Sequence, residues 1–154
     1  MLPAFNEQIN IKKSIEEFLE TGVFDEIIVI DNNSSDNTAN EIKKTSATYI
    51  LEKKQGYGVA IRTGLKNCTG DYIVMCEPDG TFQANDIHKL LSYAEQFDCV
   101  FGTRTSKSAI AKDAKMQFYL RVGNILVAKF LSYLFFGPTL SDVGCTFKLI
   151  SKNS

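Results

Sequence analysis

The chain has 154 residues and a mass of 17.2 kDa, so it has room for one domain with a sizeable core. Hydrophobic residues make up 44% of the sequence and charged residues 23%, which excludes a disordered or collagen-like chain. The net charge is −1, from 17 basic and 18 acidic residues, so there is no positive excess to bind a nucleic-acid backbone.

The sequence carries neither an export signal nor a disulfide pattern. The first thirty residues lack a basic leader followed by an apolar core, so we expect a cytoplasmic protein. The four cysteines form no CxxC pair, so we expect free thiols rather than a disulfide framework or a zinc site.

Apolar periodicity predicts helices and strands in alternation along the chain. Helical spacing is expected at residues 11–19, 36–44, 56–68, 85–96 and 118–136. Short apolar runs typical of strands are expected at residues 26–30, 48–51, 71–76, 99–101 and 145–150. Asn6 and Asp36 precede the first two helices as candidate caps. The alternation is typical of an α/β fold, with a mostly parallel sheet flanked by helices, in one domain over residues 1–154.

Polar side chains follow several of the predicted strands at the point where each strand ends. Residues 31–36 follow one strand, Glu77 to Asp79 follow another, and Arg104 follows a third. Open parallel sheets bind ligands at the carboxyl ends of their strands. We therefore expect Asp31, Asp79 and Arg104 to surround one cleft.

Glu77, Pro78 and Asp79 place two carboxylates two residues apart at a strand end. In an extended segment both can approach one Mg²⁺ or Mn²⁺ ion, which would bridge to a diphosphate. An ordinary Pro-Asp-Gly turn accounts for the same residues.

The other polar segments also allow two interpretations. Residues 31–36 could hydrogen-bond a base or ribose, or could form a polar turn that caps a helix. Gly56 and Gly58 allow a backbone to approach a ligand closely, although chain geometry alone could require them. No dinucleotide-binding or P-loop glycine pattern is present. His88, the only histidine, is expected to be structural, since nothing near it suggests a catalytic triad.

The apolar segment from Phe118 to Phe136 is interrupted by Arg121, Asn124 and Lys129, which argues against a membrane span. Its aromatic residues could pack in a core. Together with the two basic residues, they could instead seat the helix against a bilayer interface or a lipid-linked acceptor.

Read in order, the segments resemble the family 2 glycosyltransferases, inverting enzymes with the GT-A nucleotide-sugar fold. The resemblance rests on Leu2 to Glu7, Val29 to Thr38, Gly56 to Ala60, Gly70 to Ile73, Glu77 to Gly80, Gly102 to Arg104 and Asp142 to Lys148. Within the family the chain is most similar to the polyprenyl-phosphate sugar transferases, among them dolichol-phosphate mannosyltransferase. These similarities imply transfer of a sugar from a nucleotide-diphosphate sugar to an acceptor, in the building of cell-envelope glycans.

The resemblance also implies roles for individual residues. The nucleotide-sugar site would comprise Pro3, Phe5, Glu7, Val29, Asp31, Gly56, Gly58, Pro78, Asp79 and Arg104. Glu77 and Asp79 would hold Mg²⁺ or Mn²⁺, so that Asp79 also counts as catalytic. Asp142 and Lys148 match a region near the acceptor. Asp142 is the candidate base if the acceptor is a hydroxyl, whereas a lipid phosphate at the cytoplasmic membrane face would barely need one.

Several positions depart from the family pattern. Glu77 replaces the usual first aspartate of the acidic motif, Asn32 stands where a second aspartate is common, and Thr81 stands where a glutamine sometimes helps to bind metal. The chain is also short at both ends relative to the family, so we expect a truncated domain that binds nucleotide weakly.

Two alternatives stay open. One is a non-catalytic nucleotide-binding subunit that kept the fold. The other is a sugar nucleotidyltransferase, which should show a Gly- and Arg-rich loop after its first strand, where this chain has Pro-Ala-Phe-Asn-Glu.

Overall fold

A computed structural model of the chain describes residues 1–103, 118–134, 142 and 144–152. The chain forms two compact units. The larger unit comprises Met1–Val100 and Phe147–Ser154, and the smaller unit comprises Phe101–Thr146.

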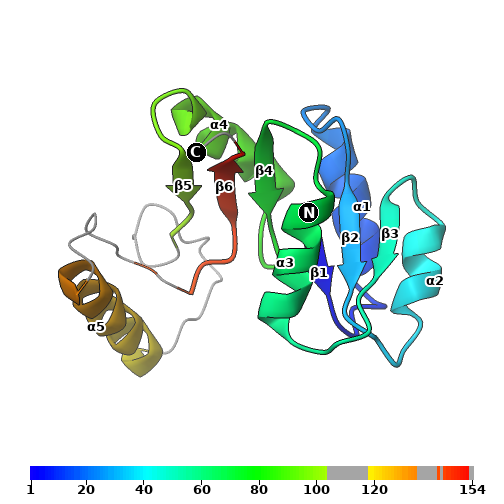
Figure 1. The fold of residues 1–154 in the computed structure, drawn as a ribbon, viewed down its shortest axis with the longest axis horizontal. Helices are drawn as coiled ribbons and strands as arrows, with labels where there is room; N and C mark the ends of the chain where they lie inside the picture. Colours follow the sequence, from blue (N-terminus) through cyan, green and yellow to red (C-terminus); the bar gives the residue numbers. More distant parts are fainter. Residues whose placement is uncertain (104–117, 135–141, 143, 153–154) are drawn as a thin grey trace. The chain divides into compact units, whose positions relative to one another are not determined.

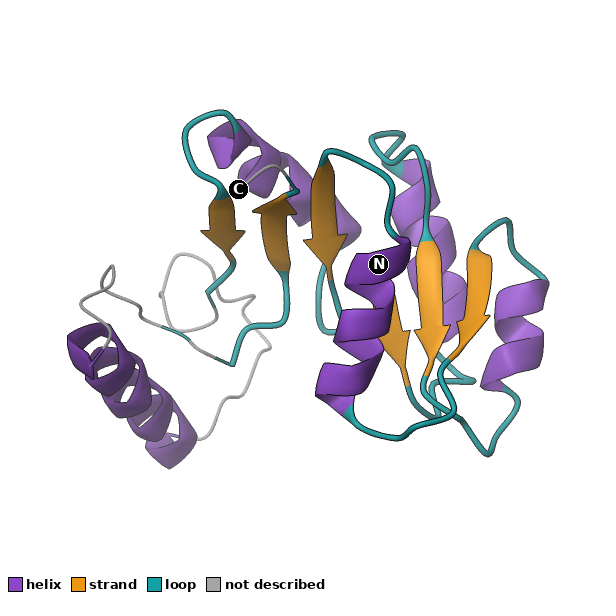
Figure 2. Ribbon diagram, viewed as in Figure 1, coloured by secondary structure: helices purple, strands orange, loops and turns teal. Residues whose placement is uncertain are grey.

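The first half of the larger unit is built on a parallel sheet of three strands in the order β1-β2-β3. The strands are β1 (Leu2–Ala4), β2 (Ile28–Asp31) and β3 (Thr48–Leu51). Every residue of β2 is buried, as expected for an apolar run covered on both faces. Figures 1 and 2 show α3 (Tyr57–Asn67) over one face, with α1 (Ile11–Glu20) and α2 (Thr38–Lys43) behind the other.

The second half of the larger unit holds a sheet in the order β4-β6-β5. The strands are β4 (Tyr72–Met75), β5 (Cys99–Phe101) and β6 (Lys148–Ser151), and α4 (Ile87–Ala94) follows a short 3-10 turn. β6 runs antiparallel to β4, with Val74 opposite Leu149. The two sheets are joined through Met1, whose amino nitrogen donates to the carbonyl of Val74 and whose carbonyl accepts from the amide of Cys76. β1 therefore lies beside β4.

In the smaller unit, α5 (Phe118–Leu134) carries large exposed apolar side chains, with Leu126 and Phe130 more than 60% exposed. Ala128 is buried. Among the helices that the structure describes, none is long and apolar enough to cross a membrane.

The predicted α/β architecture is confirmed, and several element boundaries fall close to their predicted positions. β3 and β5 have the predicted bounds, α3 is one residue shorter at each end, and the last strand covers residues 148–151 rather than 145–150. The residue at the cap position of α2 is Asn37 rather than the predicted Asp36, although Oδ1 of Asp36 does accept from the amide of Thr38, the first residue of the helix (3.0 Å).

The prediction that Asn6 caps the first helix is wrong. Asn6 has a positive φ of 57° and lies four residues before Asn10, the residue that precedes the helix. The chain first makes a turn in which the carbonyl of Glu7 accepts from the amides of Asn10 (3.1 Å) and Ile11 (2.9 Å). The helix can begin only after this turn is complete.

Candidate functional site

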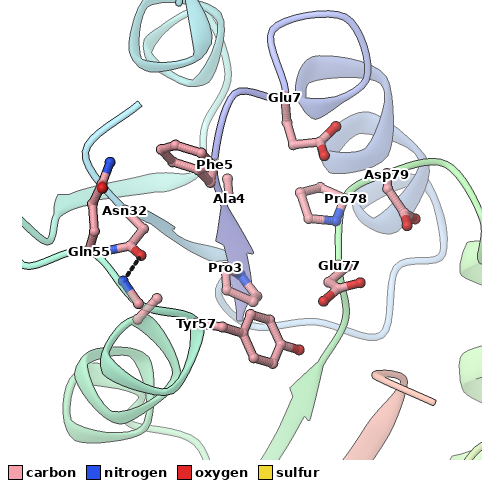
Figure 3. A pocket seen from close by; sticks show the side chains of 12 residues that line it. Pro3, Ala4, Phe5, Glu7, Asn32, Gln55, Tyr57, Glu77, Pro78 and Asp79 are labelled. Carbon is pink, nitrogen blue, oxygen red and sulfur yellow. Dashed lines mark hydrogen bonds between the residues drawn. The ribbon is translucent and has the colours of Figure 1, made fainter. Parts of the chain in front are cut away.

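The larger unit contains a pocket of about 490 Å³ where β1, β2 and β4 end (Figure 3). It is lined by Pro3, Ala4, Phe5, Glu7, Asn32, Gln55, Gly56, Tyr57, Ala60, Glu77, Pro78 and Asp79. Its position follows from the topology, because the parallel strands β1, β2 and β4 all direct their carboxyl ends to one edge. The loops after these strands and the start of α3 form the walls.

Acidic side chains dominate one side of the pocket. Glu77 and Asp79 follow β4, and Glu7, in the loop after β1, completes a group of three carboxylates (Figure 3). Oδ1 of Asp79 accepts from the amide and hydroxyl of Thr81 (2.9 and 2.6 Å). No lysine or arginine is among the lining residues in the described part of the chain. This side of the pocket is therefore suited to a cation.

The electrostatics of Glu7 reflect this concentration of negative charge. Partial burial raises the pKa of the Glu7 carboxyl, and the charges of Asp79 and Glu77 raise it further. A hydrogen bond from Nδ2 of Asn10 to Oε2 of Glu7 (3.3 Å) opposes the shift. A bound cation would relieve the repulsion among the three carboxylates.

Tyr57, at the first position of α3, directs its hydroxyl toward Glu77 (Figure 3). The pKa of this hydroxyl is raised, first by burial and then by the nearby charge of Glu77. A phenol that stays protonated is able to donate to a carboxylate.

The opposite side of the pocket, around Phe5 and Gln55, carries no charged side chain (Figure 3). Phe5 is half exposed, so its ring is accessible from the pocket. Gly56 has a φ of 140°, a conformation that side chains disfavour, so a glycine is needed where the loop enters α3.

Asn32, at the end of β2, holds this wall together. Its Nδ2 donates to the carbonyls of Glu52 (3.2 Å) and Lys54 (2.8 Å), and its Oδ1 accepts from the amide of Gly56 (2.7 Å). The side chain thereby joins β2 to the loop before α3. From the sequence, Asn32 was predicted to belong to a polar turn or a base-binding segment and was noted as a departure from the family pattern, so this role was missed. An amide side chain directly after a buried strand was the available signal.

Three residues predicted for the nucleotide-sugar site do not line the pocket. Val29 is fully buried within β2, and Gly58 lies in the first turn of α3. Asp31 is 2% exposed, and its oxygens accept from the amide of Ser34 (2.9 Å) and the hydroxyl of Tyr49 (3.1 Å). The contacts of Asp31 are thus within the fold.

Two further predicted residues belong to other parts of the chain. Arg104 lies outside the described residues. Asp142 is in the smaller unit, where it is buried and its Oδ1 accepts from Nδ2 of Asn124 and from the amide of Gly144. Of the remaining motif residues, Lys148 is half-buried at the start of β6 and His88 is exposed on α4.

The acidic side of the pocket fits a divalent cation that takes some of its ligands from the protein and the others from a substrate. Within the described residues, no three or more His, Cys, Asp or Glu side chains come close enough together to hold a metal ion on their own, so Glu7 is not counted as a ligand beside Glu77 and Asp79. Mg²⁺ characteristically takes only one or two carboxylates and fills its other positions with water and phosphate oxygens. Glu77 and Asp79 can supply those two carboxylates.

Comparison with known proteins places the whole chain in one family. The family described as "Glycosyl transferase family 2" matches residues 1–154. Glycosyltransferase AglJ of Haloferax volcanii is 26% identical over 156 residues, covering all of this chain and 50% of AglJ. The low-salt glycan biosynthesis hexosyltransferase Agl6 of the same organism is 28% identical over 160 residues, covering all of this chain and 38% of Agl6. The chain thus spans half or less of the length of these relatives.

Solved structures show the same fold. The crystal structure of glucosyl-3-phosphoglycerate synthase from Mycobacterium tuberculosis aligns with a TM-score of 0.71 and 20% identity, covering 99% of this chain and 56% of the synthase. A complex of that synthase with Mn²⁺, UDP-glucose and phosphoglyceric acid aligns with a TM-score of 0.69 and 20% identity, covering 99% of this chain and 55% of the synthase. The predicted sheet flanked by helices is the fold of this group.

Proposed function

Because the chain belongs to glycosyl transferase family 2, we propose that it transfers a sugar from a nucleotide-diphosphate sugar to an acceptor, with inversion at the sugar carbon. The pocket at the ends of β1, β2 and β4 is the proposed nucleotide-sugar site. One observation carries this proposal most directly: three carboxylates line one side of the pocket with no basic lining residue in the described chain. A diphosphate can approach such a surface only with a cation between them.

We propose that the nucleoside binds on the uncharged side of the pocket and the diphosphate on the acidic side. On the uncharged side, the accessible ring of Phe5 offers a stacking surface for a nucleotide base. Glu7 can accept hydrogen bonds from ribose hydroxyls. Pro3 and the backbone of Gly56 complete the wall against which the nucleoside would lie.

Glu77 and Asp79 are the proposed ligands of Mg²⁺ or Mn²⁺, and Pro78 sets the spacing between them. When bound, such an ion neutralises the charge that builds up on the departing diphosphate. Manganese in the synthase complex with UDP-glucose supports this assignment. The proposed role of Arg104, which follows β5 in the sequence, is to contact the phosphates.

The acceptor side of the reaction is proposed to involve the smaller unit. Asp142 is the candidate base for a hydroxyl acceptor, since a buried carboxylate held by Asn124 and Gly144 has a fixed orientation. A polyprenyl phosphate is the acceptor that we favour. The exposed apolar residues of α5 support it, because they would suit a peripheral position at the cytoplasmic face of a membrane. The phosphoglyceric acid in the synthase complex supports a small anionic acceptor instead.

Thermal unfolding with GDP, UDP and CDP, each with Mn²⁺ or with EDTA, tests the proposal. A ligand at about a hundred times its Kd stabilises the native state by about 2.7 kcal/mol, so one nucleotide should raise the melting temperature when Mn²⁺ is present. Equal shifts in Mn²⁺ and in EDTA would refute the metal site, and the absence of any shift would refute the nucleotide site. Adding polyprenyl phosphate or phosphoglyceric acid to the nucleotide complex then separates the two acceptors.

A further inference from the structure

The buried face of α1 contains one polar residue, Ser14, among apolar side chains. The buried residues of this helix are Ile11, Ser14, Ile15 and Phe18, so Ser14 is the one polar side chain among them. It is 6% exposed. Its hydroxyl donates to the carbonyl of Pro78, 64 residues away in sequence, over 3.2 Å. A helix residue at a core position thus contacts the backbone of the acidic segment Glu77–Asp79.

Among the described residues, the other bond to a backbone carbonyl of this segment comes from Sγ of Cys76, which donates to the carbonyl of Glu77 (3.4 Å). The ladder between β4 and β6 ends with Met75 opposite Lys148, and the amide of Cys76 makes the next bond, to Met1. Pro78 has no amide hydrogen to donate. Its side chain is fully buried, so an unbonded carbonyl at this point would cost stability. The bond from Ser14 satisfies that carbonyl, which lies between the two carboxylate residues in the chain.

The start of α1 approaches the same segment at a second point. Asn10, which precedes the helix, donates to the Glu7 carboxylate. A Cβ placed on Gly80 would lie 4.0 Å from Oδ1 of Asn10, so the chain after Asp79 runs close to this end of the helix. α1 therefore contacts Glu7 through Asn10 and the Glu77–Asp79 segment through Ser14. One rigid helix sets the distance between the two groups of acids.

We propose that Ser14 is a positioning residue for the acidic side of the pocket, acting through the Pro78 carbonyl to preset the Glu77 and Asp79 carboxylates for a divalent cation. The inference rests on the proposed function, which supplies the cation. Ordering a loose segment at the moment of binding would reduce affinity, and the Ser14 bond makes that ordering part of folding instead.

The test is Mn²⁺ binding, measured by electron paramagnetic resonance on the full chain and four variants, in the presence of whichever of GDP, UDP and CDP gives the largest Mn²⁺-dependent rise in melting temperature. Ser14→Ala removes the hydroxyl and Ser14→Thr keeps it. Thr21→Val is the matched control, because Thr21 lies at the other end of α1 and its hydroxyl donates to the carbonyl of Phe18 (2.6 Å), away from the pocket. Asp79→Asn removes a proposed ligand.

We expect Ser14→Ala to weaken Mn²⁺ binding about three- to tenfold, which is at or below the lower limit of the roughly 10–100-fold effects of groups bonded directly to metal ligands, because Ser14 acts through the backbone. Ser14→Thr and Thr21→Val should bind within about twofold of the parent chain, a change below 0.5 kcal/mol. Hydrogen exchange without metal should show faster exchange at Gly80 and Thr81 in Ser14→Ala only. If Ser14→Thr does not fold, the comparison of Ser14→Ala with Thr21→Val decides.

The outcomes separate the two proposals. Binding by Ser14→Ala within twofold of the parent chain, or equal losses in Ser14→Ala and Thr21→Val, overturns the positioning role. If Asp79→Asn still loses binding in that case, the proposed metal site stands. A parent chain that binds no Mn²⁺, or that binds it as well as Asp79→Asn does, overturns both.

Discussion

The ends of β2 and β4 carry similar side chains but use them differently. After β2, the polar side chains bond to the fold itself. Asp31 accepts from Ser34 and Tyr49, and Asp36 accepts from Thr38 and from the amide of Gln8 (3.2 Å). After β4, Glu77 and Asp79 face the pocket, and among the described residues Asp79 hydrogen-bonds only to Thr81, through Oδ1.

The loop after β2 supports the loop after β1. The amide of Asn6 donates to Oγ of Ser34 (3.0 Å), and Oδ1 of Asn6 accepts from the amide of Ser35 (2.9 Å). The amide of Glu7 donates to Oγ1 of Thr38 (2.8 Å). These bonds fix the loop that places Phe5 and Glu7 in the pocket. Acidic and amide residues at a strand end therefore either stabilise neighbouring loops or line the pocket. Those that stabilise loops are recognised by their hydrogen bonds to other parts of the fold.

The largest effect should come from the end of β4. Asp79→Asn should weaken Mn²⁺-dependent UDP binding about a hundredfold, or about 2.8 kcal/mol, because it removes a charged ligand while Oδ1 still accepts from Thr81. The melting temperature without metal should stay the same or rise, since one of three mutually repelling charges is gone. Calorimetric titration and thermal unfolding measure the two quantities. A large loss of stability would place Asp79 among the supporting residues instead.

At the end of β2, we expect stability rather than binding to change. Asn32→Asp should lower the free energy of unfolding by about 2–3 kcal/mol, because a carboxylate would face the carbonyls of Glu52 and Lys54 without a hydrogen to donate. Urea unfolding measures the change. Full stability in the variant would show that Asn32 does not hold the wall, although aspartate is common there in the family that the sequence resembles.

Asp31→Ala tests whether the buried carboxylate at the end of β2 also contributes to stability rather than to binding. It leaves the amide of Ser34 and the hydroxyl of Tyr49 without their acceptor, so the free energy of unfolding should fall by about 2 kcal/mol. UDP affinity, measured well below the melting temperature, should change little. If affinity falls as strongly as in Asp79→Asn, Asp31 contacts the nucleotide, as the sequence analysis predicted.

The smallest effect concerns Glu7, whose amide bonds to the loop after β2 while its carboxylate lines the pocket. Its carboxyl pKa is raised in the folded chain, so the native state holds this proton to a higher pH than the unfolded state does. Stability therefore falls as pH rises through that interval. Without metal, Glu7→Gln should raise the melting temperature slightly at about pH 7.5, and the gain should vanish near about pH 4. A gain that persists at the lower pH would have another cause.

Local patterns were enough to predict most of the elements. The β-branched run at Ile28–Ile30 and the apolar Thr48–Leu51 gave strands at the expected places, because strand and helix periodicity is a property of neighbouring residues. The acidic pair Glu77 and Asp79 was also found from local chemistry, since a strand end is recognisable in sequence and both residues line the pocket.

The interactions that a local pattern cannot show were missed. The Asn6–Ser34 and Ser14–Pro78 bonds join residues 28 and 64 positions apart, so nothing near either residue indicates its partner. The position of Asn6 before a helical pattern predicted a cap, yet its bonds go to the loop after β2. Asp31 and Glu77 are both acids after apolar strands, and only packing separates the buried one from the one in the pocket.

The return of the chain through β6 has a consequence for how such a protein can diversify. The chain leaves the larger unit after Val100 and comes back at Phe147, beside the strand it left, with the amide of Ser151 bonded to the carbonyl of Asp98 (2.7 Å). The intervening segment therefore begins and ends at two neighbouring strands, β5 and β6. Because the entropy of closing a flexible loop grows only slowly, by about 0.6 kcal/mol per doubling of length, adding flexible residues to this segment would cost little in closure entropy. The segment between β5 and β6 can thus change in length while these two strands stay neighbours in their sheet.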